Sequence, residues 1–246
     1  MAFFIGSRYP KQIVLSDVVA PLIEFYQALQ ADPVKFAYTV AQIGIEYGLD
    51  EKAYYAVRDE RPEEPLHRAA QFMYLNALGF NGIYRENASG EYNVPAGSKA
   101  KNGTAKLPER RVFELASKSL ELADIRCIDF EAMIDYAEEK DFLYIDSPYA
   151  ETFSDYSKGG FGKTEHERLA VALFRAHERG VTFLAHNSLT GSVEEEIGVQ
   201  WRYGEWSQII PIDEARTVSA NGDRTKAQCA LITNSNELAE KLKGVV

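Results

Sequence analysis

The sequence predicts an α/β fold, in which a mainly parallel sheet ends in an antiparallel C-terminal hairpin and is interrupted by an inserted helical domain. Three observations predict it. Short apolar runs alternate with helical segments in the second half of the chain, and residues 34–80 show helical spacing of apolar positions. Asn221-Gly222 lies between two strand-like runs. Strands separated by helices are typical of a parallel sheet, and Asn-Gly between strands indicates a hairpin.

The order of the expected elements follows from the same patterns. The first half is expected to hold a strand at 11–17, helices at 18–30, 34–48, 51–60 and 66–80, a loop at 81–106 and a helix at 110–123. The second half is expected to hold strands at 126–130, 141–146 and 181–188, a helical turn at 131–139, a helix at 164–179 and the hairpin at 215–234. Thr164 and Glu167 form the expected capping box of the long helix, and Gly180 follows its end.

Composition limits the functions that are open to this chain. Its 246 residues carry a formal net charge of −10, with two cysteines and four histidines that show no metal-ligand spacing. The sequence contains no apolar run of about 18 residues, and the opening MAFFIG is too short for a signal peptide. We therefore expect a metal-free cytoplasmic protein. The net charge argues mildly against nucleic acid, but the basic residues of the stretch 97–111 give it local positive charge.

The stretch FLYIDSPYAE at 142–151 is the main candidate for chemistry. Asp146 ends an apolar strand, and ligands of α/β sheets bind at the carboxyl ends of strands. A carboxylate and a backbone carbonyl that both accept N–H bonds from an aromatic amine would free its lone pair for attack on a methyl group. Pro148 would fix the chain direction, and Tyr149 could stack a flat base. The alternative is an ordinary Ser-Pro turn after a strand.

Taken together, these segments resemble the Dam-type DNA adenine N6-methyltransferases (D12 class, α-group), whose catalytic motif is Asp-Pro-Pro-Tyr. VLSDVVAPLIEFYQAL is similar to the family's acidic motif, and RCIDF to its short Asp-Phe motif. FMYLNALGFNGIYRENASGEYNVPAGSKAKN is similar to its recognition segment. The order of segments is that of the α-group. The resemblance implies a Rossmann-like methyltransferase sheet at 1–35 and 113–246, and a helical target-recognition (DNA-binding) domain at 36–112.

The resemblance also implies a function and a set of site residues. It implies transfer of a methyl group from S-adenosylmethionine to N6 of a flipped adenine in double-stranded DNA. Asp146, Ser147, Pro148 and Tyr149 would be catalytic, while Asp17, Asp129, Phe130 and Asp146 would bind the cofactor. The expected DNA-binding residues are Phe80, Asn81, Ile83, Arg85, Asn93, Pro95, Gly97, Lys99 and Lys101. Arg85 is the candidate for reading a guanine, and Phe80 or Ile83 could fill the vacated stack.

Two departures from the family pattern leave alternatives open. Ser147 replaces a proline of the motif and makes the turn less rigid, and the family's Phe-x-Gly-x-Gly cofactor loop is expected to be missing together with a central strand. A truncated, inactive DNA-binding relative is therefore one alternative. A nucleotide hydrolase built on Gly162-Lys163-Thr164 is another, although the preceding strand and first glycine of a phosphate loop are not found there. Pattern alone does not separate a solitary methylase from the partner of a restriction enzyme.

Overall fold

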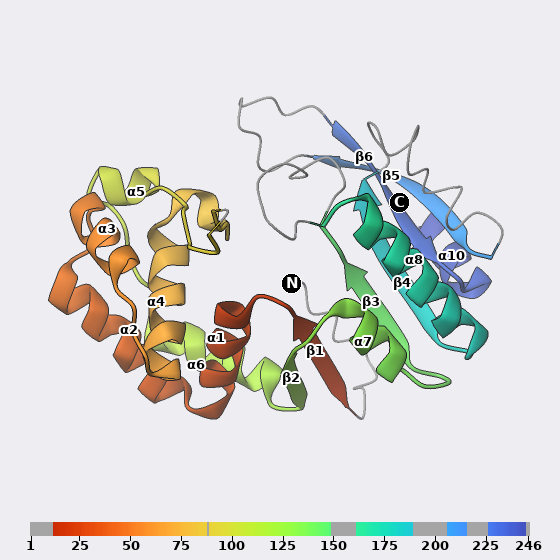
Figure 1. Cartoon of the computed structure of the whole chain (residues 1–246), viewed down its shortest axis with the longest axis horizontal. Helices are drawn as coiled ribbons and strands as arrows, with labels where there is room; N and C mark the ends of the chain where they lie inside the picture. The colour runs from red at the N-terminus through yellow and green to blue at the C-terminus, as the bar shows by residue number, and fades with distance from the viewer. Residues whose placement is uncertain (1–11, 88, 149–160, 189–205, 216–225, 245–246) are drawn as a thin grey trace. The chain divides into compact units, whose positions relative to one another are not determined.

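The computed structural model describes residues 12–87, 89–148, 161–188, 206–215 and 226–244. Contacts divide the chain into two compact units, Phe3–Asp129 and Phe130–Val246 (Figure 1). The first unit is mainly helical, and the second is built on a mixed sheet. Within the described ranges no helix is long and apolar enough to cross a membrane. In the same ranges no group of three or more His, Cys, Asp or Glu residues could hold a metal ion.

The unit Phe3–Asp129 begins and ends, in its described part, with a strand. Its elements are β1 (Ile13–Asp17), α1 (Ala20–Ala31), α2 (Pro33–Tyr47), α3 (Glu51–Asp59), α4 (Pro65–Leu78), the 3-10 turn η1 (Phe80–Gly82), α5 (Ser98–Lys101), α6 (Arg110–Leu120) and β2 (Ala123–Cys127). The helical periodicity expected between 34 and 80 is confirmed. Pro33 and Pro65 stand at the first turns of α2 and α4, where a missing N–H costs nothing. Asp32 caps α2 by accepting from the N–H groups of Val34 and Lys35.

Strand β2 lies three residues earlier than the sequence pattern predicted. It covers Ala123–Cys127 instead of 126–130, and it pairs with β1 in parallel so that Asp17 is opposite Cys127. Ala123 and Ile125 are buried while Asp124 and Arg126 face outward and form an ion pair at 2.5 Å. This alternation is a strand signal. The prediction missed it because Ala123 was assigned to the preceding helix, which ends at Leu120.

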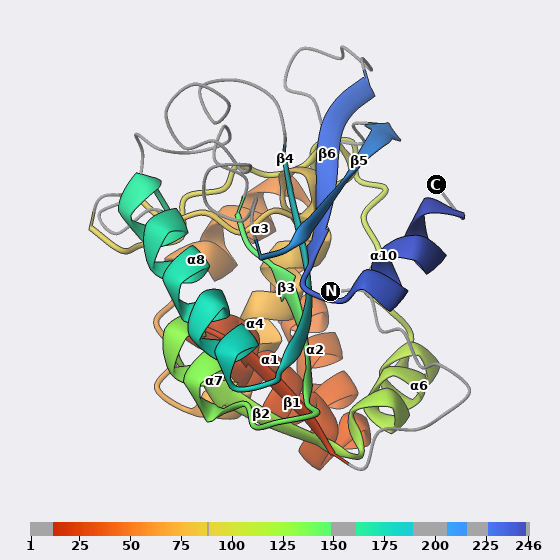
Figure 2. The same ribbon diagram turned by 90° about the vertical axis from the view of Figure 1, so that its right-hand side faces the viewer.

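The unit Phe130–Val246 contains a four-stranded sheet with helices on both faces. Its elements are α7 (Phe130–Tyr136), β3 (Phe142–Asp146), α8 (Lys163–Glu178), β4 (Thr182–Ser188), β5 (Gln208–Ala215), β6 (Lys226–Thr233) and α10 (Asn236–Lys243). The strand order is β3-β4-β6-β5, with β3 and β4 parallel and β6 antiparallel to both of its neighbours. Figure 2 shows α7 and α8 on one face of this sheet and α10 on the other. The result is an α/β unit in which β4 and β6 are the interior strands of the sheet.

The core of this unit lies between α7, α8 and the sheet. Leu169 and Leu173 of α8 pack with Phe183 of β4 and Ile232 of β6, all at most 2% exposed. Burying such large side chains is the main favourable term in folding. The core therefore fixes the strands whose ends carry the candidate catalytic residues.

The cap of α8, the glycine after it and the C-terminal hairpin were also predicted in this unit. Helix α8 is capped by Glu165, whose carboxylate accepts the Gly162 N–H at 3.0 Å, and not by a Thr164–Glu167 box. Gly180 follows the helix with φ +82°, as predicted, a conformation that favours glycine. β5 covers 208–215 and so precedes the stretch expected to start the hairpin. The Asn221-Gly222 turn itself is outside the described residues.

Candidate functional site

Asp146 is the last residue of β3 and lies at the carboxyl edge of the parallel pair β3–β4. Its backbone is opposite His186 of β4, and its side chain is exposed. Pro148 follows two residues later and cannot donate an N–H, so the ladder cannot continue there. The predicted strand and its end at Asp146 are confirmed. Tyr149 lies outside the described residues.

Ser147 is held by Asn187 of β4, a residue that the sequence analysis did not name. The Asn187 Nδ2 donates to Ser147 Oγ at 3.1 Å. Asn187 is 9% exposed, and its backbone is opposite Ala230 of β6. The available signal was positional: in parallel strands that pair Asp146 with His186, the next residue of each strand lies at the same level. A polar residue at the end of VTFLAHNS was therefore a candidate for this edge.

Phe130, expected to flank the cofactor, opens α7 and packs against α8. Its ring lies 5.5 Å from that of Phe161, centroid to centroid, and the Arg168 guanidinium carbon lies 4.9 Å from its centroid. Arg168 and Arg175 both donate to the Glu131 carboxylate. These hydrogen bonds hold the pKa of Glu131 below its usual range. One aromatic ring and one charged network thus orient the start of α7.

Asp17 and Asp129 lie at the carboxyl edge of the other parallel pair, β1–β2. The Asp17 carboxylate accepts the Val19 N–H at 2.8 Å, and its backbone is opposite Cys127, two residues before Asp129. Burial, and secondly the charge of Asp17, raises the pKa of Tyr26. Asp17 therefore ends β1, and Asp129 follows the end of the neighbouring strand β2 by two residues. They belong to one unit, whereas Asp146 and Phe130 belong to the other.

The segment 79–97 forms a narrow loop that returns to the end of α4. The Phe80 N–H donates to the Pro95 carbonyl at 2.9 Å, and the Gly97 N–H donates to the Leu78 carbonyl at 2.8 Å. A Cβ at Gly97 would lie 2.7 Å from the Gly79 carbonyl oxygen, so the two chain segments approach as closely as glycine allows. Three of the expected DNA-binding residues, Phe80, Pro95 and Gly97, thus meet in one place.

Arg85 and Asn93 bind one another across this loop. The Arg85 Nε donates to Asn93 Oδ1 at 2.7 Å, its Nη2 donates to the Asn93 carbonyl at 3.3 Å, and the Asn93 N–H donates to the Arg85 carbonyl. Arg85 remains exposed. A guanidinium held along one edge presents a fixed fork of donors, which suits bidentate recognition of a base.

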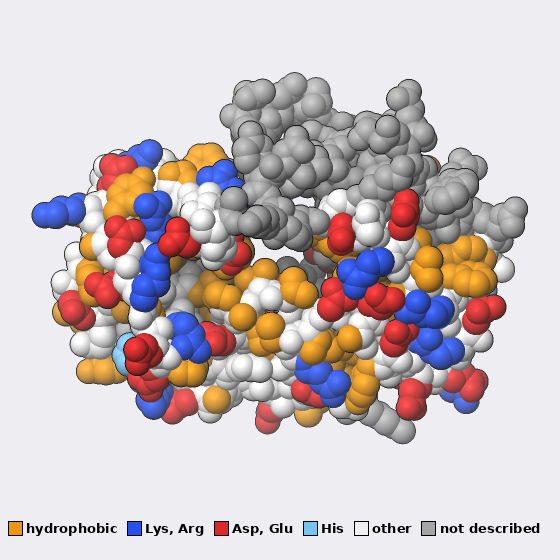
Figure 3. Space-filling view, in the orientation of Figure 1, with side chains coloured by type: hydrophobic (Ala, Val, Ile, Leu, Met, Phe, Trp, Pro, Cys, Tyr) orange, Lys and Arg blue, Asp and Glu red, His pale blue; other side chains and the backbone are white. Residues whose placement is uncertain are grey.

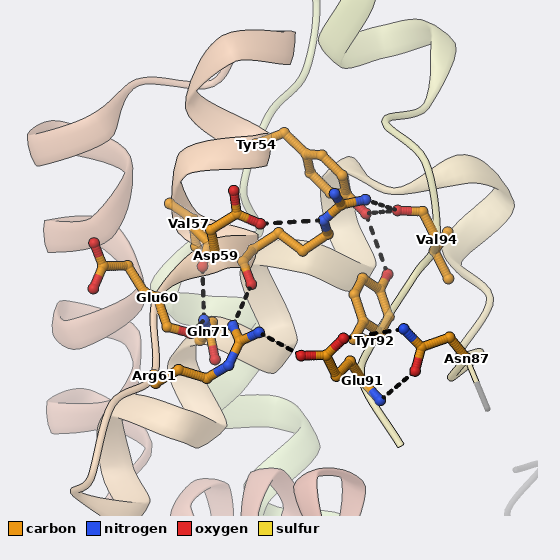
Figure 4. A network of polar contacts seen from close by, with 11 residues as sticks. Tyr54, Val57, Asp59, Glu60, Arg61, Gln71, Asn87, Glu91, Tyr92 and Val94 are labelled. Atoms are coloured by element: carbon orange, nitrogen blue, oxygen red, sulfur yellow. Dashed lines mark hydrogen bonds and ion pairs between the residues drawn. The ribbon is translucent and has the colours of Figure 1, made fainter. Parts of the chain in front are cut away.

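The returning limb of the loop is anchored to α3 (Figure 4). The Tyr54 hydroxyl donates to the Val94 carbonyl at 2.9 Å, and Arg61 forms an ion pair with Glu91 at 3.5 Å. Burial and a hydrogen bond with Tyr92 raise the pKa of Tyr54, so its hydroxyl stays protonated. The limb that carries Asn93 is therefore fixed to a buried side chain of the helical unit.

Phe80 and the expected DNA-binding residues not yet described are at least partly exposed around this loop. Phe80 is 44% exposed, Ile83 is half-buried, and Asn81 has the left-handed φ of 54°. Lys99 and Lys101 are exposed on α5. Figure 3 shows acidic and basic side chains interspersed over the described surface of the visible face. On this face, a contact with phosphates would depend on local cations and not on a large basic field.

A family model matches most of the chain. Residues 2–218 match the D12 class N6 adenine-specific DNA methyltransferase model. The chain belongs to this family. A DNA N-6-adenine-methyltransferase of Escherichia phage P1 is 34% identical over 230 residues, which are 90% of this chain and 29% of that protein. The chain thus spans less than a third of the length of this relative.

Other relatives match over larger shares of their own length. The type II methyltransferase M.MjaIII of Methanocaldococcus jannaschii is 28% identical over 91% of this chain and 80% of its own. A DNA adenine methylase of Vibrio cholerae is 27% identical over 86% of this chain and 76% of its own. The resemblance proposed from the motifs is confirmed. The expected lack of the Phe-x-Gly-x-Gly loop stays a prediction.

The backbone at Gly162 bears on the alternative that Gly162-Lys163-Thr164 forms a phosphate loop. In a phosphate loop the backbone N–H groups at the start of a helix bind the phosphates. Here the Gly162 N–H is occupied by Glu165, a negatively charged group from the same helix. The local structure is therefore that of a capped helix.

Proposed function

We propose that this chain transfers a methyl group from S-adenosylmethionine to N6 of adenine in double-stranded DNA. The observation that carries the proposal is the placement of Asp146-Ser147-Pro148 at the carboxyl end of parallel strand β3, in a member of the N6 adenine-specific family. That edge is where α/β sheets bind ligands. We further propose that the two sheets belong to a Rossmann-like methyltransferase architecture with a C-terminal hairpin.

The proposed chemistry needs a carboxylate and a carbonyl near the amine. The Asp146 carboxylate and the Ser147 carbonyl would accept the two N–H bonds of the adenine amine and draw its nitrogen toward tetrahedral geometry. The lone pair would then form the N–C bond to the methyl group as the C–S bond breaks, and the C–S electron pair would stay on sulfur in the leaving S-adenosylhomocysteine. The methylated, positively charged amine would release one proton to water. Tyr149 would stack the flipped base. S-adenosylmethionine supplies the electrophilic methyl group.

Asp17, Asp129 and Phe130 are the residues proposed to hold the cofactor. Asp17 is partly buried at a strand end, and its carboxylate already accepts one N–H, which suits it to fix ribose hydroxyls. Phe130 is half-buried and offers an aromatic surface for a flat base. Asp146 would face the methyl donor as well as the adenine. The described residues thus include carboxylates and an aromatic ring of the kinds that such a cofactor needs.

Residues 36–112 are proposed to recognise the target, and 1–35 with 113–246 to carry out catalysis. Arg85 would read a base with its orientation fixed by Asn93, while Phe80 or Ile83 would fill the space left by the flipped adenine. Asn81, Pro95 and Gly97 would shape the loop, and Lys99 and Lys101 would bind phosphates. The double-stranded DNA would be met in the cytoplasm.

The alternative of an inactive DNA-binding relative is not favoured, because the relatives are named as methyltransferases. At least three of the relatives are named type II methyltransferases, which favours a connection to restriction and modification. The first experiment is therefore a test of turnover.

The test measures N6-methyladenine by mass spectrometry in unmethylated DNA incubated with the protein and S-adenosylmethionine. Asp146→Ala is expected to lose at least about 100-fold in rate, because it removes an acceptor for the reacting amine. Asp141→Ala is the matched control, since this carboxylate lies just before β3, at its opposite end, and accepts the Glu138 N–H. It should retain turnover. Activity that survives in Asp146→Ala would contradict the assignment of the catalytic site.

A further inference from the structure

We propose that Asn187 is a positioning residue for the methyl transfer. Its side-chain amide holds Ser147 and thereby the backbone carbonyl that accepts the adenine amine. The inference rests on the proposed function and adds to it a residue on β4, outside the Asp-Ser-Pro-Tyr segment. It starts from one contact, the hydrogen bond of 3.1 Å from Asn187 Nδ2 to Ser147 Oγ.

The location of this hydrogen bond gives it a mechanical role. The backbone ladder between β3 and β4 ends with the pair Asp146–His186. The Asn187–Ser147 hydrogen bond therefore links the next residues of the two strands through side chains. Ser147 follows the last residue of the backbone ladder and precedes a proline that has no N–H to contribute. Without the hydrogen bond from Asn187, the backbone ladder alone would not hold Ser147 to β4. The side-chain contact extends the strand registration by one residue, to the residue whose carbonyl is needed.

Asn187 is a rigid support because it belongs to an interior strand of the sheet. β4 is flanked by β3 and β6, and the Asn187 backbone is opposite Ala230, which is fully buried. Asn187 itself is 9% exposed. A donor fixed by a packed strand transmits little motion to its acceptor, whereas a donor on a loop would restrain Ser147 weakly.

Serine at position 147 explains why such a support is needed. The Asp-Pro-Pro-Tyr motif has a proline there, whose ring fixes φ at about −65° without a hydrogen bond from another residue. Serine has no such restraint, and only the following Pro148 limits its backbone. The hydrogen bond from Asn187 replaces a covalent restraint with a tertiary one. Because the restraint on Ser147 comes from Asn187, we expect the effects of mutations at positions 147 and 187 to be energetically coupled.

The test is a kinetic double-mutant cycle on the full chain. Asn187→Ala is expected to lower kcat about five- to ten-fold and to change KM for DNA and for S-adenosylmethionine less than about two-fold, because orientation and not binding is lost. In a Ser147→Pro background the same Asn187→Ala change should lower kcat less than about two-fold. Proline makes the tether unnecessary, and a general packing defect would persist in both backgrounds.

Two further variants keep the test decisive. Ser147→Ala removes the same hydrogen bond from the less buried partner and should lower kcat to a similar extent, so a folding failure of Asn187→Ala does not end the experiment. Asn234→Ala is the matched control, because its amide also supports β4, by hydrogen bonds to the backbone of Phe183 and Val181 near the opposite end of the strand. It should lower the melting temperature without changing the kcat of folded protein.

The outcomes separate the two proposals. If the wild-type chain does not methylate DNA, the proposed function fails and the positioning role fails with it. If the wild type turns over and Asn187→Ala leaves kcat unchanged, or lowers it equally in the Ser147→Pro background, the positioning role alone is overturned. A smaller effect in the proline background supports it.

Discussion

At the residue scale, the loop at 79–97 illustrates how a side chain can be oriented before a binding partner arrives. Arg85 is exposed, yet one edge of its guanidinium is already hydrogen-bonded to Asn93, 2.7 Å away at its closest. Asn93 is in turn part of a limb anchored by Tyr54. A long side chain that is held in this way loses less conformational entropy on binding. We therefore propose that Arg85 reads a base and does not serve as a general phosphate contact.

This assignment predicts a change in specificity. Arg85→Ala should weaken binding to the preferred site by about 1–3 kcal/mol and reduce discrimination at one base pair, measured with duplexes that vary one position at a time. Asn93→Ala should have a smaller effect in the same direction, because the fork is kept but no longer oriented. Lys101→Ala is the comparison, since loss of a phosphate contact should weaken all duplexes about equally. Uniform weakening by Arg85→Ala would contradict base readout.

Single residues also show how far the sequence could predict the site. Asp146 was identified because a carboxylate after an apolar strand is a local pattern, and its place at the end of β3 is confirmed. Asn187 was missed because its role depends on a parallel register with a strand 40 residues earlier in the chain. Such a register follows from the packing of the helices between the strands, and no short segment encodes it.

At the scale of elements, α7 and α8 are joined by a charged network as well as by their apolar core. Glu131 of α7 accepts from Arg168 and Arg175 of α8, and Asp135 binds Arg175 at 3.0 Å. All of these side chains are partly exposed, so solvent weakens each pair. Their common effect is to orient Phe130, which precedes Glu131 and packs against Phe161.

The network predicts a dependence of stability on pH. The pKa of Glu131 is lowered in the folded chain, so the folded state resists protonation that the unfolded state accepts. Its contribution to the free energy of unfolding is present above the unfolded value of about 4.3 and is lost as pH falls through the lower folded pKa. Glu131→Gln should therefore flatten the decline in stability below about pH 5, measured by urea unfolding at a series of pH values.

The control for this measurement is Glu139→Gln. Glu139 lies 3.9 Å from the exposed Lys140, and the pair does not join two helices. Its replacement removes the same charge, yet the pH profile should stay like that of the wild type because an exposed ion pair contributes little. An equal flattening by both variants would mean that the profile reports net charge and not the α7–α8 network.

The elements themselves were predicted to different degrees. Helices α2, α3 and α4 were predictable because apolar residues repeat at helical spacing and prolines or aspartates mark their starts. The start of α8 was misassigned because Gly162 and Glu165 form its cap, and a glycine cap has no side-chain signature to compete with Thr164. The boundary between α6 and β2 was misplaced because Ala123 suits a helix and a buried strand equally well.

At the scale of the whole molecule, the net charge of −10 repels DNA, which is the proposed substrate and is also negatively charged. Binding to DNA depends on the number of phosphates contacted, so a few well-placed cations are sufficient. Lys99 and Lys101 are exposed on the short helix α5, which directly follows the loop at 79–97. The net charge would then affect how fast the protein approaches DNA, while the local cations would determine the salt dependence of the equilibrium.

This division predicts the result of a salt titration. Replacement of Lys99 and Lys101 by glutamine should reduce the slope of log K against log salt by about two, because two phosphate contacts are lost. The double replacement of Lys241 and Lys243 changes the net charge equally. These lysines pair with Glu237 and Glu240 on α10 and should leave the slope unchanged. Equal slopes for the two variants would contradict a local phosphate contact.

The hydrogen bond between Ser147 and Asn187 also has a consequence for the evolution of this chain. If Ser147 depends on the Asn187 amide for its orientation, the effect of a mutation at position 187 depends on which residue stands at position 147. A change of Ser147 to proline would release Asn187, whereas loss of Asn187 first would carry a penalty in turnover. Descendants of this sequence should therefore reach other residues at position 187 mainly through proline at position 147, and the order of the two mutations is set by the chemistry of the turn.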